Sequence, residues 1–371
     1  MQWIVAMTGD TNAFIPPHCP RTDCDYHRCR PGWRWVRYGS FVRRATPASI
    51  PRYRCRHCGH TFSSQSFSPT YWLKRPDLLE PIANGVLACG GYRQLARSLR
   101  CSPGTVLEQV RRLGRHALLL LEQHRPRGPV REPLVVDGFE SFAYSQYHPL
   151  YLNLVVGAHS HLVYAFTHSP LRRKGRMTAG QRKRRAALES EDGRPDPRAI
   201  ELGTHRALAL AARQPQALVV RSDEHAAYPR ALRRLAGYRV VHERTNSKEA
   251  RTARNPLFPV NRLDLLLRHS SANHKRETIA FSKRHQSVVE RAAWLIAWLN
   301  LVKPFSERHG GGTPAQRAGT AQRPYTVREL LHRRLFKAHI RLPEEYSAYH
   351  EGTVRTPRIR NERRFTARLT V

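Results

Sequence analysis

The chain has 371 residues, and its 64 lysine and arginine residues face only 28 aspartate and glutamate residues, which leaves a formal net charge of +36. A charge of this size and sign favours a polyanionic partner such as a nucleic acid. No apolar run reaches the roughly 18 residues of a membrane span, and the first residues lack a leader pattern, so we expect a cytosolic protein with no membrane partner. The length predicts two or three domains.

Cysteines are concentrated near the start of the chain. Two pairs, Cys19-x4-Cys24 and Cys55-x2-Cys58, have spacings at which four thiolates can surround one tetrahedral zinc ion. This segment has too few apolar residues to fold unaided, which also favours a metal. We predict a zinc-ribbon DNA-binding module over residues 1–68, held by a structural zinc ion.

Three other cysteines and one histidine complicate this assignment. The x4 spacing of the first pair is wide, so His27 or Cys29 could replace Cys24 as a ligand. Cys89 and Cys101 lie in helical surroundings, and we expect them to be small core residues.

Residues 74–124 carry apolar side chains at helical spacing. Within them, 90–106 reads as a helix, a short turn and a second helix, with Ser102 as a natural N-cap and Pro103 at the first helical position. This pattern resembles a helix-turn-helix whose second helix, running to about Leu113, enters a major groove. We predict a DNA-binding domain read out by four residues: Thr105, Gln109, Arg111 and Arg112.

The pattern changes from helices to strands after a Pro/Gly linker at 125–129. Three successive strands, expected to be antiparallel, are followed by two strands that alternate with helices. We expect strands at 134–142, 150–157, 161–168, 217–221 and 238–242, and helices at 198–213, 226–235 and 286–302. This order matches the ribonuclease H-like topology, so we predict an α/β domain with a mixed sheet over residues 130–303.

Two aspartates stand at the ends of near-identical apolar runs. Asp137 follows Leu-Val-Val, and Asp223 comes shortly after a second Leu-Val-Val. The first and fourth strands of such a sheet are neighbours, so the two carboxylates should lie close together. With a third acid they could hold two magnesium or manganese ions about 3.5–4 Å apart, as phosphodiester chemistry requires. The alternative is a pair of aspartates that only cap loops and helices.

At this point the sequence resembles the DDE-type transposases of small bacterial insertion sequences. The segment 221–228, Arg-Ser-Asp-Glu-His-Ala-Ala-Tyr, looks like that family's second-aspartate motif with a tyrosine five residues on. The segments 261–268 and 275–283 look like its last catalytic helix and the basic segment that follows. The likeness spans most of residues 19–303 and implies end binding, metal-dependent strand cleavage and strand transfer.

The third acid departs from the family pattern. The family's glutamate position falls on Asn261, while Asp264 lies one turn further along the same helical face. We therefore predict a DDD set of Asp137, Asp223 and Asp264, with Glu249 and Glu290 as lesser candidates for the third acid and Glu140 as a supporting group. The asparagine also keeps open a catalytically impaired, transposase-derived DNA-binding protein.

Basic residues follow the last expected acid, and the resemblance implies that they line the DNA backbone: Arg268, His274, Lys275, Arg276, Lys283 and Arg284. The basic insertion 172–185 reads as a DNA clamp or a disordered loop. Residues 304–371 read as a basic C-terminal tail, mobile over 304–324.

The predicted function is that of a DNA transposase. It would bind transposon ends and target DNA as a homo-oligomer, in the bacterial cytoplasm and associated with the nucleoid. A ribonuclease H-like nuclease that cleaves without joining is the other enzymatic alternative.

Overall fold

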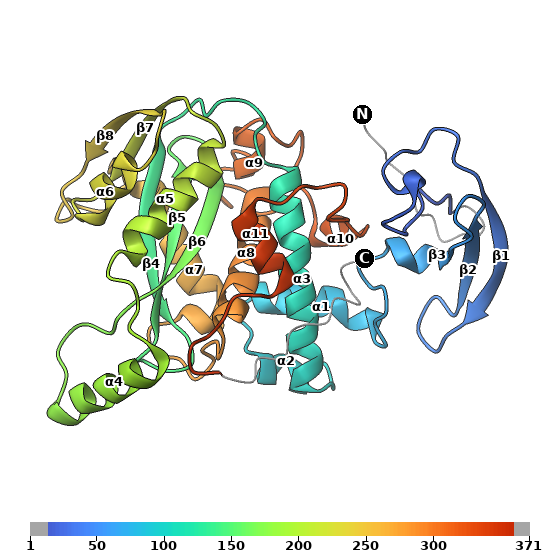
Figure 1. The fold of residues 1–371 in the computed structure, drawn as a ribbon, viewed down its shortest axis with the longest axis horizontal. Coiled ribbons are helices and arrows are strands. Elements are labelled where there is room, and N and C mark those ends of the chain that lie inside the picture. Colours follow the sequence, from blue (N-terminus) through green and yellow to red (C-terminus); the bar gives the residue numbers. More distant parts are fainter. Residues whose placement is uncertain (1–13, 360–371) are drawn as a thin grey trace.

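The computed structural model describes residues 14–359. Figure 1 shows a small strand module at one end, a layer of helices in the middle and a larger sheet at the other end. The two sheets are separate, one with three strands and one with five. The mixed α/β architecture predicted from the sequence is present.

The N-terminal module is an antiparallel sheet in the order β1-β2-β3 with two short 3-10 helices. Its core is mostly aromatic: Tyr53, Phe62 and Phe67 are buried around the cysteines. The elements of the module are η1 (Asp25–His27), β1 (Trp35–Val42), β2 (Ser49–Cys55), β3 (Thr61–Ser63) and η2 (Ser64–Phe67).

The middle helices begin as predicted. Ser102 caps α3, since its side chain accepts a hydrogen bond from the backbone N–H of Thr105, and Pro103 is the first helical residue. The helix runs well past the expected end near Leu113, because the apolar residues that follow pack it against α8. The elements are η3 (Pro76–Leu78), α1 (Leu79–Leu87), α2 (Tyr92–Ser98) and α3 (Pro103–Gln123).

The larger sheet has the strand order β6-β5-β4-β7-β8. Strands β4, β5 and β6 are antiparallel neighbours, whereas β7 runs parallel to both β4 and β8. The first and fourth strands are therefore adjacent, as expected. The strands are β4 (Leu134–Phe142), β5 (Pro149–Gly157), β6 (Val163–Pro170), β7 (Ala217–Ser222) and β8 (Arg239–Arg244).

Helices cover both faces of this sheet. Helix α5 packs on β5 and β6, with α6 beside it, whereas α7 packs on β4 and β5 and α8 fills the space between the sheet and α3. The basic insertion is partly a helix, α4, which projects away from the sheet in Figure 1. The helices are α4 (Ala179–Asp192), α5 (Ala199–Ala212), α6 (Ala227–Arg233), α7 (Phe258–Ser270), η4 (Ala272–His274) and α8 (His285–Leu301).

Residues 304–359 differ from the expected basic tail. They form α9 (Pro314–Arg317), α10 (Val327–Leu330) and α11 (Glu344–Glu351), and they pack across the molecule. Phe336 joins the core of the N-terminal module, and Tyr346 and Tyr349 are buried against the larger sheet. The segment packs in this way because burying these aromatic side chains stabilises it by more free energy than its charged residues cost. Residues 360–371 lie outside the described part of the chain.

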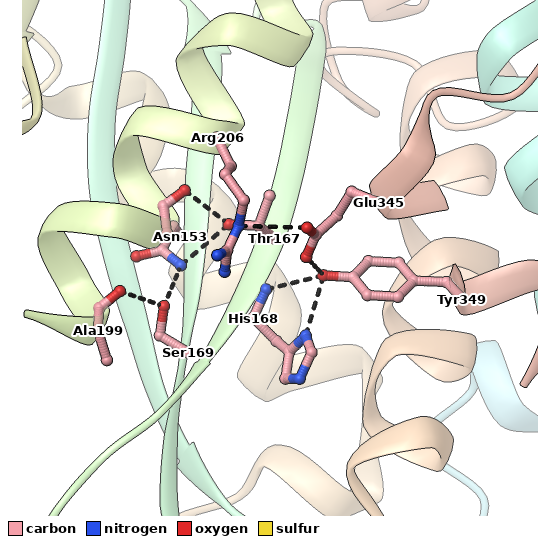
Figure 2. Close-up of polar contacts among 9 residues, drawn as sticks. Asn153, Thr167, His168, Ser169, Ala199, Arg206, Glu345 and Tyr349 are labelled. Atoms are coloured by element: carbon pink, nitrogen blue, oxygen red, sulfur yellow. Dashed lines mark hydrogen bonds and ion pairs between the residues drawn. The ribbon is translucent and has the colours of Figure 1, made fainter. Parts of the chain in front are cut away.

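Figure 2 shows how α11 is attached to β6. The hydroxyl of Tyr349 accepts hydrogen bonds from the backbone N–H of His168 (3.0 Å) and from its ring Nδ1 (3.0 Å), and it donates one to Glu345 (2.6 Å). Arg206 of α5 forms an ion pair with Glu345 at 3.2 Å. The C-terminal segment is thus bonded into the sheet domain.

None of the helices within residues 14–359 combines the length and the apolar character that crossing a membrane would take.

Candidate functional site: an aspartate cluster beside a basic surface

The three predicted aspartates come from three neighbouring elements. Asp137 lies in β4, Asp223 follows the last residue of β7, and Asp264 lies in α7, which packs on β4. Their charges affect one another: Asp223 and Asp264 each interact electrostatically with Asp137. The fold therefore places the three acids within electrostatic reach of one another, although their carboxylate oxygens do not all lie within 4.8 Å of one another as the ligand atoms of a compact metal site would.

Asp137 is held in place by two hydrogen bonds to one carboxylate oxygen. Its Oδ1 accepts from the backbone N–H of Gly138 at 2.7 Å and from the hydroxyl of Tyr228 at 3.0 Å. Burial raises the pKa of Asp137 and the negative charge of Asp223 raises it further, while these two donors act in the opposite direction.

Tyr151 is a site residue that the sequence analysis missed. Burial and the charge of Asp137 raise the pKa of its phenol, and it is hydrogen bonded to Tyr228. It can cross beside β4 only because residue 138 is glycine: a Cβ there would lie 1.4 Å from Cε1 of Tyr151. The glycine directly after Asp137 was the available signal.

Asp223 is half-buried and stands at the start of a turn. Its Oδ1 accepts a hydrogen bond from the backbone N–H of His225 at 2.9 Å, which fixes the side chain where the chain leaves the sheet. Ser222, just before it, is fully buried and bonded to His242 of β8 at 2.8 Å. The capping role that the sequence analysis kept as an alternative is thus present, together with the proximity to Asp137.

Of the three aspartates, Asp264 has the fewest favourable contacts to offset the burial of its carboxylate. Its Oδ1 is buried and accepts no hydrogen bond. Burial raises its pKa to about 8, the charge of Asp137 contributes in the same direction, and Arg268 and Arg251 only partly offset both. A buried carboxylate oxygen without a hydrogen bond is costly, and a cation is a partner that could offset this cost.

The other candidates for the third acid lie elsewhere. Glu290 is buried in α8 next to α3, where Gln286 donates a hydrogen bond to it at 2.9 Å. Glu249 is exposed in the loop before α7. Glu140 is exposed, and its backbone carbonyl accepts a long hydrogen bond from Arg268. Asn261 precedes Asp264 by one turn of α7 and is half-buried.

Four cysteines of the N-terminal module form a second candidate site. The Sγ atoms of Cys19, Cys24, Cys55 and Cys58 all lie within 4.8 Å of one another. Cys19 and Cys58 are 3.7 Å apart, close to the roughly 3.8 Å between two sulfurs of a tetrahedral zinc ion with Zn–S bonds of about 2.3 Å. The cluster could bind a metal such as zinc.

The environment of Cys55 also suits a metal ligand. Burial alone would raise the pKa of the Cys55 thiol, but the backbone N–H of Cys58 and the indole N–H of Trp33 outweigh it and lower that pKa to about 7. Cys29 is exposed and outside the cluster, and His27 binds the carbonyl oxygen of Cys19 instead of joining it.

Two of the four predicted base-reading residues are misplaced for that role. Gln109 is buried and donates to the carbonyl of Arg75, and Arg112 is largely buried and donates to the carbonyl of Pro69. We therefore remove both from the candidate DNA contacts, since their face of α3 packs inward. Thr105 is half-buried, and Arg111 pairs with Glu108 at 2.6 Å.

A basic loop connects the helical layer with the sheet. Lys275, Arg276 and Lys283 are exposed on it, as expected, whereas His274 is buried and bonded to Ser141 of β4 at 3.0 Å. The same loop reaches α2, because a Cβ on Gly91 would lie 3.6 Å from that of Ala280.

Arg268 has a defined place rather than a free one. Its guanidinium stacks over Phe139 at 4.5 Å and donates to the carbonyl of His274 at 3.1 Å. It therefore stands one turn from Asp264, on the same face of α7.

Comparison with known proteins gives little. Neither a protein-family model nor a curated protein matches the chain. Among solved structures, the chain is similar to a chain of the simian T-cell lymphotropic virus intasome in complex with the PP2A regulatory subunit B56 gamma, at 13% identity and a TM-score of 0.25, over 66% of this chain and 75% of that chain. A similarity this weak supports no functional inference.

Proposed function

We propose that this protein is a metal-dependent DNA transposase with a ribonuclease H-like catalytic domain. The observation that carries the proposal is the buried, unpaired Oδ1 of Asp264, which faces the like charge of Asp137. Three carboxylates that interact electrostatically around Asp137 suit divalent cations, and a cation would draw them closer than in the metal-free fold, where they do not all lie within 4.8 Å of one another. The strand order β6-β5-β4-β7-β8 supports the fold assignment.

Asp137, Asp223 and Asp264 would hold the cations, which when bound supply Lewis-acid activation for cutting and joining phosphodiester bonds. Tyr228 orients Asp137 by binding its Oδ1, and Tyr151 supports Tyr228 from the neighbouring strand. Such preorganisation matters because small displacements of a ligand cost activity.

The surface around the cluster fits DNA. The exposed cations of the 275–284 loop lie beside α2, whose Arg93 and Arg97 are exposed one turn apart. Phosphate contacts from such residues position a duplex without reading its sequence. A continuous basic surface would lead from the helical layer towards the acids, and the +36 charge of the whole chain agrees with this partner.

The proposal is tested with a supercoiled plasmid that carries the gene and its flanking DNA, incubated with magnesium or manganese. We expect nicks at the element ends and joined products from the wild type. Asp137→Asn and Asp264→Asn should each lose at least about 100-fold in rate, because each removes a charged ligand. Glu243→Gln, an exposed carboxylate of β8, is the matched control and should retain activity.

The remaining outcomes separate the alternatives. Nicks without joined products would indicate a nuclease. DNA binding with no nick by the wild type, together with no manganese binding by calorimetry, would leave only a DNA-binding protein and would refute the catalytic site.

A further inference from the structure

Three histidines meet where the N-terminal module contacts the C-terminal segment. One ring nitrogen from each of His18, His27 and His339 lies within 4.8 Å of the other two. His18 precedes the first cysteine, His27 ends η1, and His339 lies between α10 and α11. Two of the rings thus come from the N-terminal module and the third from a segment more than 300 residues further along the sequence.

Each ring has one nitrogen against a backbone carbonyl. Nδ1 of His18 (3.0 Å) and Nδ1 of His27 (2.7 Å) both contact the oxygen of Cys19, and Nε2 of His339 contacts the oxygen of His27 at 2.7 Å. A carbonyl accepts only from N–H, so each contact places the proton on that nitrogen and a lone pair on the other. This is the arrangement by which metal-bound histidines are oriented in proteins.

At His27 the second ring nitrogen lacks a hydrogen-bond partner. This nitrogen, Nε2, is buried, and His27 as a whole is only 1% exposed. Apolar rings surround the cluster, with Phe67 and Phe336 edge-on to His18 at 5.2 and 5.0 Å. Packing alone would leave the buried Nε2 of His27 without a partner, although the rings of His18 and the exposed His339 lie 5.0 and 4.8 Å from its own ring.

We propose that His18, His27 and His339 form a second zinc site, separate from the four cysteines, which fastens the C-terminal segment to the N-terminal module. The ligands would be one ring nitrogen from each histidine, among them the unpartnered Nε2 of His27. Imidazole nitrogen suits zinc, and three protein ligands leave one tetrahedral position open. His18 and His339 also help to line a groove of about 1130 Å³.

The proposal stands independently of catalysis. It assigns the metal a mechanical role, because it would add to the contacts that already hold this segment, which include the buried ring of Phe336 and the hydrogen bond from the backbone N–H of Arg334 to the carbonyl of Phe67 at 2.8 Å. Loss of the metal should loosen this segment while leaving the aspartate cluster unchanged.

The test measures zinc in the full-length purified protein by mass spectrometry after removal of loosely bound metal. We expect two zinc ions per wild-type chain and one in His339→Ala. His332→Ala changes an exposed histidine of the same segment that lies outside the cluster, and it should keep two. One zinc ion in the wild type, or two in His339→Ala, would overturn the proposal.

A second measurement guards against misfolding of the variant. Cobalt added to metal-free wild-type protein should saturate its thiolate charge-transfer absorption after one equivalent, while equilibrium dialysis counts two bound ions. His339→Ala should keep the thiolate absorption and bind one. Hydrogen exchange in residues 332–341 should rise at least tenfold in His339→Ala and stay unchanged in His332→Ala; equal exchange in both would contradict the fastening role.

Discussion

Individual residues around the aspartate cluster show a conflict between stability and the proposed function. The Oδ1 of Asp264 is buried without a partner, and the Tyr151 ring fills the space that a side chain at position 138 would need. Arrangements of this kind cost stability in the metal-free protein and persist where a ligand compensates.

Replacing Asp264 by asparagine should stabilise the metal-free protein. The pKa of Asp264 is about 8 in the fold and 3.8 as its ordinary value, so its favourable contribution is complete below pH 4 and is lost as the pH rises towards 8. At pH 8 Asp264→Asn should therefore increase the free energy of unfolding by about 1–3 kcal/mol and raise the melting temperature by a few degrees. At pH 4 it should not raise the melting temperature. Thermal melts of both proteins with a chelator would check this; equal melting at pH 8 would contradict it.

Gly138→Ala should disturb the aspartate site indirectly, through Tyr151. The added methyl group forces the Tyr151 ring away and with it the support of Tyr228, which costs about 1–3 kcal/mol. We expect a lower melting temperature and slower DNA cleavage. Gly180→Ala is the matched control: it lies in α4 with no atom within 4 Å of the new Cβ, and should gain up to about 1 kcal/mol.

At the scale of elements, the surface of the helical layer that is open to DNA differs from the predicted one. The face of α3 that holds Gln109 is buried, and α3 packs against α8, where a Cβ on Gly114 would lie 2.6 Å from the Cα of Glu290. The exposed cations belong to α2 and to the loop that touches it.

Arg93 and Arg97 of α2 should contribute to DNA affinity more than Gln109 does. Replacing both arginines with glutamine should weaken binding and make the slope of log K against log salt shallower by about 1–2, because each arginine that no longer neutralises a phosphate lowers the slope by about one. Gln109→Ala should lower stability instead, because it removes a buried hydrogen bond to the Arg75 carbonyl. Binding measured at several salt concentrations, beside thermal melts, distinguishes these effects; an unchanged slope in the double variant would rule out the α2 contacts.

The sequence predicted the positions of the helices and strands better than it predicted which of their sides are buried. The strand that contains Asp137 and the strand that ends just before Asp223 have runs of apolar residues that define them without tertiary information, and the Ser102-Pro103 pair located the start of α3. In contrast, the burial of Gln109 and Arg112 depends on which side of α3 meets Arg75 and Pro69, and no local pattern encodes that choice.

The fate of residues 304–359 was beyond local sequence analysis for a similar reason. Tyr346 and Tyr349 stand among charged residues, and only the hydroxyl contacts that they make on β6 show that the segment is part of the core. Likewise His18, His27 and His339 become a cluster only through the fold.

At the scale of the whole molecule, burial keeps four histidines of the described residues neutral. Burial lowers the pKa of His116 to about 4 and those of His168, His274 and His350 to about 3. Each group is neutral in the fold, whereas its ordinary pKa is 6.5. Their contribution to stability is therefore complete above pH 6.5 and decreases as the pH falls towards 4.

Stability should consequently fall steeply under mild acid. Between pH 6 and 4 each buried histidine can cost up to about 1.4 kcal/mol per pH unit. Melting temperatures measured from pH 7 to pH 4 should show this decline, and His350→Gln should flatten it. His309→Gln, an exposed residue, should leave the slope unchanged. A melting temperature that stays constant down to pH 4 would mean that these rings already carry protons in the fold.

The docking of α11 also bears on how the molecule is made. Phe166 and His168 on β6 receive their partners from Tyr346 and Tyr349, which are synthesised about 180 residues later. During translation that part of β6 stays uncovered until Tyr346 and Tyr349 have left the ribosome. A nascent chain stopped before α11 would thus expose an apolar surface to chaperones and proteases, and the sheet domain acquires this cover only after α11 has been made.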